Sequence, residues 1–291
     1  QTSIAAYKYT REGNRWQAAI DVCTEQIRCG ADLLDINFDS ELIDSKWAMG
    51  KFLRLLGAET GVARVPLVLS STTWPVIEEG LRSSQGKSIV NAISLLQGEE
   101  EFLCLARACL RYGAAVVVMT VDASEEPPGL HDRVRVGQEA YKLLRTKLDF
   151  PAEDIIFDCS ILPLGGPASP RDFLEAVAEL KRSCPSVSFI GGVGSLSMPF
   201  RAAPPLRSAL HSVFLYHAIP MGLNMAIVEP GALPCYGNIE AQTKKVCEEA
   251  ILGNAGEGGH GDQLESFAAF LCGALAEEIP TALVPAYDLP E

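Results

Sequence analysis

Residues 114–122 read "AAVVVMTVD", a run of apolar and β-branched residues that ends in an aspartate. β-Branched residues favour strands, and a run that is apolar at every position is typical of a parallel-sheet strand buried on both faces. The preceding residues 99–113, "EEEFLCLARACLRYG", have helical spacing and end at a glycine. A helix followed by a buried strand predicts an α/β fold.

The same alternation extends outward from this unit in both directions. The runs predicted to be strands are 31–37, 65–70, 88–94, 114–122, 154–158, 187–193 and 224–231. The stretches predicted to be helices are 14–30, 45–57, 74–84, 99–113, 132–148, 169–183 and 205–222. Strands that alternate with helices in this way form parallel sheets, either doubly wound or closed into a (β/α)8 barrel.

Polar residues recur where the predicted strands end. They are Asp35 and Asn37, Ser70 and Ser71, Asn91, Asp122, Asp158, Ser195, and Glu229. In a barrel all strand ends converge on one mouth, whereas in a doubly wound sheet only those near the switch point meet. The pattern therefore favours a TIM (β/α)8 barrel. Residues 1–29 read as a helix with no strand before it, so the first strand is apparently missing from the chain.

The chain is expected to divide into three parts. Residues 1–254 would form the barrel domain, and residues 255–263, "AGEGGHGDQ", are rich in glycine and polar residues as linkers are. Residues 264–291 would then form a C-terminal helix and tail.

Composition narrows the function classes. The formal net charge of −13 disfavours a nucleic-acid or anionic-membrane partner, since both need a basic face. No apolar run approaches the roughly 18 residues of a membrane span, and the first residues lack the apolar stretch of a secretory signal. We expect a cytoplasmic protein, and an organellar location stays open.

The cysteines and histidines of the sequence do not indicate a metal site or a disulfide framework. The nine cysteines are odd in number and contain no CxxC pair, which indicates reduced thiols. His211 and His217 are six residues apart on a helical stretch and do not share a face, so no metal site is predicted.

The remaining motifs leave a ring of carboxylates and amides. The string "IGGVGS" at 190–195 lacks the third glycine of a dinucleotide fingerprint and is better explained as a tight turn after a strand. No GxxxxGK[ST] or GxSxG string occurs. A ring of carboxylates and amides suits a neutral, nitrogen-rich heterocycle. The alternative is that each strand-end residue merely caps the helix that follows.

Several strings together resemble one family. They are "GADLLDINFD", "ARVPLVLSSTTW", "GLRSSQGKSIVNAISL", "RYGAAVVVMTVD", "PAEDIIFD", "IGGVGSLSMPFR" and "LRSALHSVFLYHAIPMGLNMAIV". In order and spacing they resemble the pterin-binding (methyltetrahydrofolate) domain of cobalamin-dependent methionine synthase, from about residue 10 to about residue 254. The chain is more distantly similar to dihydropteroate synthases and to corrinoid methyltransferases.

The resemblance implies a methyltransferase domain of methionine biosynthesis and one-carbon metabolism. Its barrel would bind 5-methyltetrahydrofolate, the methyl donor, and pass the N5 methyl to cobalamin on a separate corrinoid-binding domain or protein. The implied catalytic residues are Asn91, Asp158 and Ser195. The implied pterin-binding residues are Asp35, Asn37, Ser70, Asn91, Asp122, Asp158, Gly191, Gly192, Arg201 and Asn224. No metal ligand is implied, and no DxHxxG string supplies a cobalt ligand.

The chain departs from the family at the expected mouth. Ser70 replaces an aspartate, Ser160 and Ser195 each replace an asparagine, and "LNMAIVEPG" replaces "MDMGIVNAG". The family's first strand, which carries "GERTN", is absent. Losing charge-assisted hydrogen bonds would weaken pterin binding. Two alternatives therefore stay open: a catalytically impaired pseudoenzyme that serves as a binding or scaffold subunit, and a barrel with a changed substrate.

Overall fold

The computed structural model describes residues 16–253, apart from residues 122, 124–128, 167 and 201–202. The predicted linker and C-terminal helix, residues 255–291, lie outside this part of the chain.

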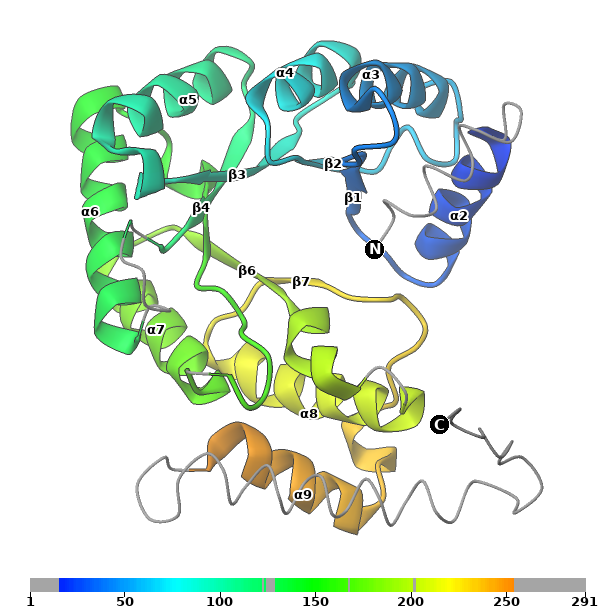
Figure 1. Ribbon diagram of the computed structural model, residues 1–291, viewed down its shortest axis with the longest axis vertical. Coiled ribbons are helices and arrows are strands. Elements are labelled where there is room, and N and C mark those ends of the chain that lie inside the picture. The colour runs from blue at the N-terminus through cyan, green and yellow to red at the C-terminus, as the bar shows by residue number, and fades with distance from the viewer. Residues whose placement is uncertain (1–15, 122, 124–128, 167, 201–202, 254–291) are drawn as a thin grey trace, which may run out of the picture.

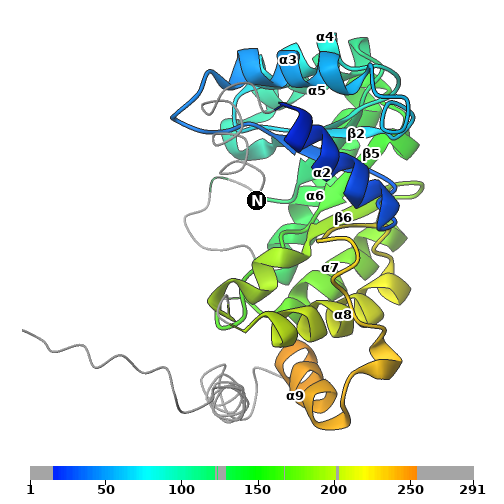
Figure 2. The same cartoon turned by 90° about the vertical axis from the view of Figure 1, so that its right-hand side faces the viewer.

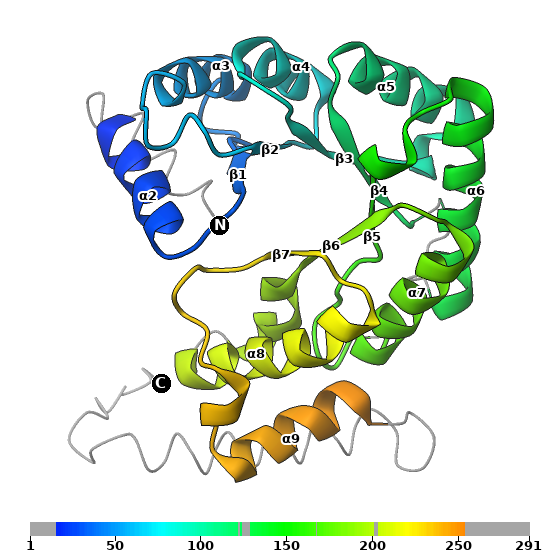
Figure 3. The ribbon, with the colours of Figure 1, turned by 180° about the vertical axis from the view of Figure 1, so that it is seen from behind.

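Seven parallel strands form the wall of a nearly closed TIM-like barrel, with helices around it (Figures 1 and 3). The strands are β1 (Leu34–Asn37), β2 (Leu67–Ser70), β3 (Ile89–Ser94), β4 (Ala115–Met119), β5 (Ile155–Asp158), β6 (Ser188–Gly192) and β7 (Met225–Ile227). They follow one another in chain order, and β1 and β7 stand at the two ends of the sheet. Among the described residues no strand pairs β1 with β7. The predicted fold class is confirmed.

The described helices lie where the periodicity predicts them, except for the last one, which was not predicted. They are α2 (Trp16–Arg28), α3 (Ser45–Leu56), α4 (Trp74–Ser83), α5 (Glu99–Arg111), α6 (Leu130–Leu148), α7 (Pro170–Ser183), α8 (Pro204–Met221) and α9 (Ala241–Leu252). The start of α7 carries a capping box, in which Ser169 and Asp172 satisfy each other's backbone N–H groups. In Figures 1 and 2, α9 lies beyond α8 on the outside of the barrel, and the two helices pack together.

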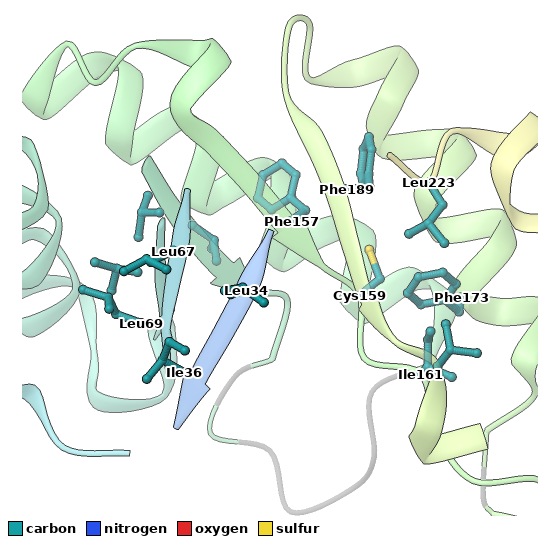
Figure 4. Packing of buried hydrophobic residues seen from close by; sticks show 14 of the residues in the cluster. Leu34, Ile36, Leu67, Leu69, Phe157, Cys159, Ile161, Phe173, Phe189 and Leu223 are labelled. Atoms are coloured by element: carbon teal, nitrogen blue, oxygen red, sulfur yellow. The ribbon is translucent and has the colours of Figure 1, made fainter. Parts of the chain in front are cut away.

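Two layers of apolar side chains pack against the two faces of the sheet. The larger lies between the strands and the helices, and Figure 4 shows Phe173 of α7 there beside Cys159 and Ile161, which follow β5. The smaller layer fills the inside of the barrel and includes Val68 and Val117. Because strand side chains alternate between the two faces, the strands are apolar at almost every position. At the carboxyl ends the inner face becomes polar.

The structure differs from the sequence-based boundaries in three places. The strand predicted at 224–231 covers only Met225–Ile227, because its pairing with β6 ends at Ile227. The chain after β6 forms a 3₁₀ segment, η3 (Val193–Phe200), which no periodicity predicts. Helix α9 lies in a stretch where no helix was predicted. No helix in the described part of the chain is long and apolar enough to cross a membrane.

Candidate functional site

The first half of the barrel mouth is built by β1, β2 and β3. Asn37, Ser70 and Asn91 are register partners across these strands and form the outermost layer of the inner face. The Ser70 hydroxyl donates to Asp35 Oδ1, one layer below, and Asn91 Nδ2 donates to Ser70 Oγ at 3.0 Å. A hydrogen-bonded chain therefore runs from Asn91 through Ser70 to Asp35.

Asp35 is the charged end of this chain. Burial raises the pKa of its carboxyl, and the hydrogen bond from Ser70 partly opposes that rise. Ser70 itself is 5% exposed, so its hydroxyl needs a partner within the protein and finds two. The Ser70 hydroxyl thus accepts from Asn91 and donates to Asp35.

Asp39, which was not among the predicted site residues, links the loops after β1 and β2 by hydrogen bonds. Its carboxylate accepts from the Ser71 hydroxyl at 2.6 Å and from the Thr72 backbone N–H at 2.6 Å. The Thr72 hydroxyl adds a third bond at 2.9 Å. The Asp39 N–H in turn donates to Asn37 Oδ1 at 2.7 Å, which orients the Asn37 amide. Asp39 therefore shapes the rim of the mouth.

Asp158 ends β5, on the other side of the mouth. Its Oδ1 accepts from the Ser160 backbone N–H at 2.8 Å, which turns the chain sharply, and Ser160 takes φ +58°, in the left-handed region. Burial raises the pKa of Asp158 to about 6, although the Ser160 bond and the charge of Arg133 both oppose the rise. A carboxylate poised near neutral pH in a barrel mouth is typical of functional sites.

Arg133 lies in the first turn of α6 and is fully buried. Burial lowers the pKa of its guanidinium, and nearby Cys159, Asp172 and Asp158 act in the opposite direction. Arg133 was not predicted from the sequence, because an arginine on a helix is ordinarily exposed and no local pattern marks this one as buried. Its charge supports the ionised form of Asp158.

The end of β6 and the segment after it contribute backbone groups and the Ser195 hydroxyl to the mouth. The bare Cα of Gly192 faces Ser195, whose Oγ would lie 3.9 Å from a Cβ at that position. Gly191 faces the other way: a Cβ there would come within 2.6 Å of Ile161 Cδ1 and 3.1 Å of Phe173 Cζ. Gly192 and Ser195 therefore belong to the mouth side, whereas the absence of a side chain at Gly191 serves helix packing.

Besides Gly191, the predicted pterin-binding residue Asn224 does not join this group. Asn224 precedes β7 at the opposite end of the strands, where its Oδ1 accepts from the Phe189 N–H at 2.9 Å. That bond links the beginnings of β6 and β7, so the geometry gives Asn224 a structural task. Asp122 and Arg201 lie outside the described residues. Glu229 lies just past β7 and is exposed.

The mouth thus gathers Asp35, Asn37, Ser70, Asn91, Asp158, Gly192 and Ser195. Carboxylates and amides dominate the set, and no cluster of three or more His, Cys, Asp or Glu side chains that could hold a metal ion occurs in the described residues. The carboxylates can accept hydrogen bonds from the ring N–H and amino groups of a ligand, and the amides can also donate hydrogen bonds to it.

Residues 6–229 match the family model described as "Pterin binding enzyme", which is well over half of the chain. The chain belongs to the pterin-binding enzyme family. The match spans every strand of the barrel and the loops that form its mouth. The family part of the resemblance is therefore confirmed, while the methionine synthase domain within the family stays a prediction.

Solved structures with the same fold include members of one enzyme class. The dihydropteroate synthase of Xanthomonas albilineans in complex with 7,8-dihydropteroate is 18% identical, with a TM-score of 0.56 over 93% of this chain and 88% of that one. The Stenotrophomonas maltophilia enzyme is 18% identical, with a TM-score of 0.55 over 92% and 90%. A Yersinia pestis enzyme is 14% identical, with a TM-score of 0.54 over 80% and 87%. At such identities the likeness establishes the fold.

Proposed function

We propose that the barrel binds a reduced pterin at its mouth and acts as the 5-methyltetrahydrofolate-binding domain of a methyltransferase. Family membership supports the pterin, and the strings shared with the methionine synthase domain favour the methyl donor. The methyl acceptor would be a corrinoid carried by a separate domain or protein, whose cobalt supplies the electron pair that takes the methyl group.

The observation that carries the proposal is Asp158. Its carboxyl is buried enough to raise its pKa to about 6, so at neutral pH it is an ionised group that the protein alone solvates poorly. The pterin ring presents an N–H and an amino group side by side, which match the two oxygens of one carboxylate. A pterin would therefore supply the hydrogen bonds that compensate the buried charge.

The chain from Asn91 through Ser70 to Asp35 would hold the ring from the other side. Because Asn91 donates to Ser70 at 3.0 Å, its amide plane is fixed and its carbonyl is directed away from that bond. Ser195 on η3 would lie close to the methyl-bearing nitrogen. When the methyl leaves N5, that nitrogen must gain a proton, and Ser195 would orient the donor.

A titration of the purified chain with 5-methyltetrahydrofolate tests the pterin site. We expect saturable binding by calorimetry, and Asp158→Asn should weaken it about tenfold or more because a charge-assisted pair is lost. Asp154→Asn is the matched control: Asp154 lies at the other end of β5 and pairs with Lys87 at 2.6 Å. Equal losses in the two variants, or no binding by the wild-type chain, would contradict the proposal.

A second candidate, a pterin-binding subunit without catalytic activity, is favoured by one observation. Ser70 stands where the resemblance to the methionine synthase domain places an aspartate, and its hydroxyl is hydrogen-bonded to Asn91 and Asp35. The part of the mouth formed by β1 to β3 would therefore carry one negative charge fewer than that domain. Incubation with cob(I)alamin and 5-methyltetrahydrofolate separates the two, since methyl transfer appears as the absorption change to methylcobalamin. Binding without that change supports the second candidate.

A further inference from the structure

Three polar side chains meet behind the mouth, where η3 packs on α8. Ser197 is fully buried, and its Oγ lies 2.7 Å from His211 Nε2 and 3.1 Å from Arg207 Nε. Arg207 and His211 are four residues apart on α8, so they lie on the same face of that helix. This trio takes no part in the contacts proposed for the pterin.

Ser197 can satisfy both neighbours at once. Arg207 Nε–H can only donate, so Ser197 Oγ accepts from it. A hydroxyl has one proton and two lone pairs, so Ser197 either donates to His211 Nε2 at 2.7 Å, or accepts from Nε2–H and donates to the Gly194 carbonyl at 3.4 Å. A neutral His211 meets both arrangements.

The electrostatics of His211 agree with this assignment. Burial lowers the pKa of His211, and the positive charge of Arg207 lowers it further. A protonated His211 would place a second cationic donor against the hydroxyl that already accepts from Arg207. The neutral form is the one that satisfies all three groups.

The trio anchors the segment that carries Ser195. Ser197 is two residues beyond Ser195 in η3, and Leu196 between them accepts from the Leu164 N–H at 3.1 Å. Leu164 belongs to the connection that follows Asp158 and β5. The 3₁₀ segment is therefore held from α8 on one side and from the loop of Asp158 on the other.

We propose that Arg207 and His211 are positioning residues of the mouth. By orienting Ser197 they fix the backbone from Gly192 to Ser195 at the place where a bound pterin would meet it. This inference rests on the proposed pterin site and deepens it, because it makes the order of η3 depend on a neutral histidine outside the site.

A pair of substitutions at His211 tests the role. In His211→Gln the side-chain amide can replace Nε2 as the hydrogen-bond partner of Ser197 in either direction, whereas His211→Leu fills the space without a polar group. We expect His211→Leu to weaken 5-methyltetrahydrofolate binding about tenfold. His211→Gln should stay within about threefold of the wild-type affinity. Amide NMR signals of Gly192, Gly194 and Ser195 in the ligand-free chain should shift in the Leu variant and remain near their wild-type positions in the Gln variant.

The spectra separate this inference from the proposed function. If the wild-type chain binds no pterin but the amide shifts follow the expected pattern, the positioning stands and the pterin site fails. If the two variants lose affinity and thermal stability equally, or if the Leu variant leaves the three amides unshifted, the positioning role is overturned.

Discussion

At the scale of single residues, Asp158 shows how a site costs stability. Its carboxyl lies at the end of a buried strand, has one backbone donor in Ser160, and keeps a pKa of about 6. Ser160 adds to the cost, because its φ of +58° is unfavourable for a residue with a Cβ, and its hydroxyl is buried without a hydrogen-bond partner among the described residues. The turn that presents the carboxylate is thus locally unfavourable, as functional sites often are.

The stability of the chain should therefore depend on pH through Asp158. The unfolded carboxyl titrates near its ordinary value and the folded one at about 6, so the folded state binds the extra proton between about pH 4 and pH 6. As pH rises through that window the wild-type chain loses stability, and Asp158→Asn does not. Between pH 4 and pH 8 the stability of the wild-type chain should fall by about 1–3 kcal/mol relative to that of the variant.

Urea unfolding of both proteins at several pH values between 4 and 8 measures this difference. Other titrating groups contribute equally to the two proteins and cancel in the comparison. Stability curves that run parallel across the whole range would show that the carboxyl is not perturbed.

At the scale of elements, strand β6 carries a glycine, Gly191, against which Ile161 and Phe173 of helix α7 pack. A methyl group at Gly191 would overlap Ile161 Cδ1 at 2.6 Å and crowd Phe173 Cζ at 3.1 Å, and both side chains are buried. Gly191→Ala should lower the free energy of unfolding by about 1–3 kcal/mol. Adding Ile161→Val removes the Cδ1 atom and should restore part of the loss.

The comparison is made by chemical denaturation of the two single variants and the double variant. Ile161→Val alone should cost about 0.5–1.5 kcal/mol, because it opens a small cavity in the layer under α7. Additive losses in the double variant would mean that Gly191 is needed for its backbone conformation rather than for the space beside it.

The elements also show what the sequence could predict. All seven strands and the helices between them follow from apolar runs and helical spacing, since burial on both faces leaves a strong pattern. The segment η3 has no such pattern, and its anchor at His211 depends on a contact with Ser197 fourteen residues away. Arg133 was missed because helix position alone does not indicate burial. Asn224 was predicted to bind the pterin from its place in the string "LNMAIVEPG", but it lies before β7, at the end of the strand away from the mouth.

At the scale of the whole molecule, the described sheet has seven strands, and its two end strands, β1 and β7, are not paired with each other in the described part of the chain. In a strand at the end of a sheet, every second backbone N–H points away from the sheet and has no strand to bind. Amide hydrogen exchange should therefore be slowest in β4 and β5 and fastest in β1 and β7. Protection of β1 and β7 equal to that of β4 would mean that another strand pairs with both ends.

The unpaired ends also bear on what the mouth can hold. A closed ring of strands has a radius fixed by strand number and stagger. The wall described here is an arc, and an arc can change its radius while every one of its ladder hydrogen bonds remains. Asp35 and Asn37 lie on one end strand, and Gly192 lies on the strand beside the other end. The span between these two groups is therefore not fixed by closure of the described strands and depends on how the helices pack behind them, so residues that never touch a ligand help to set the width that the mouth accepts.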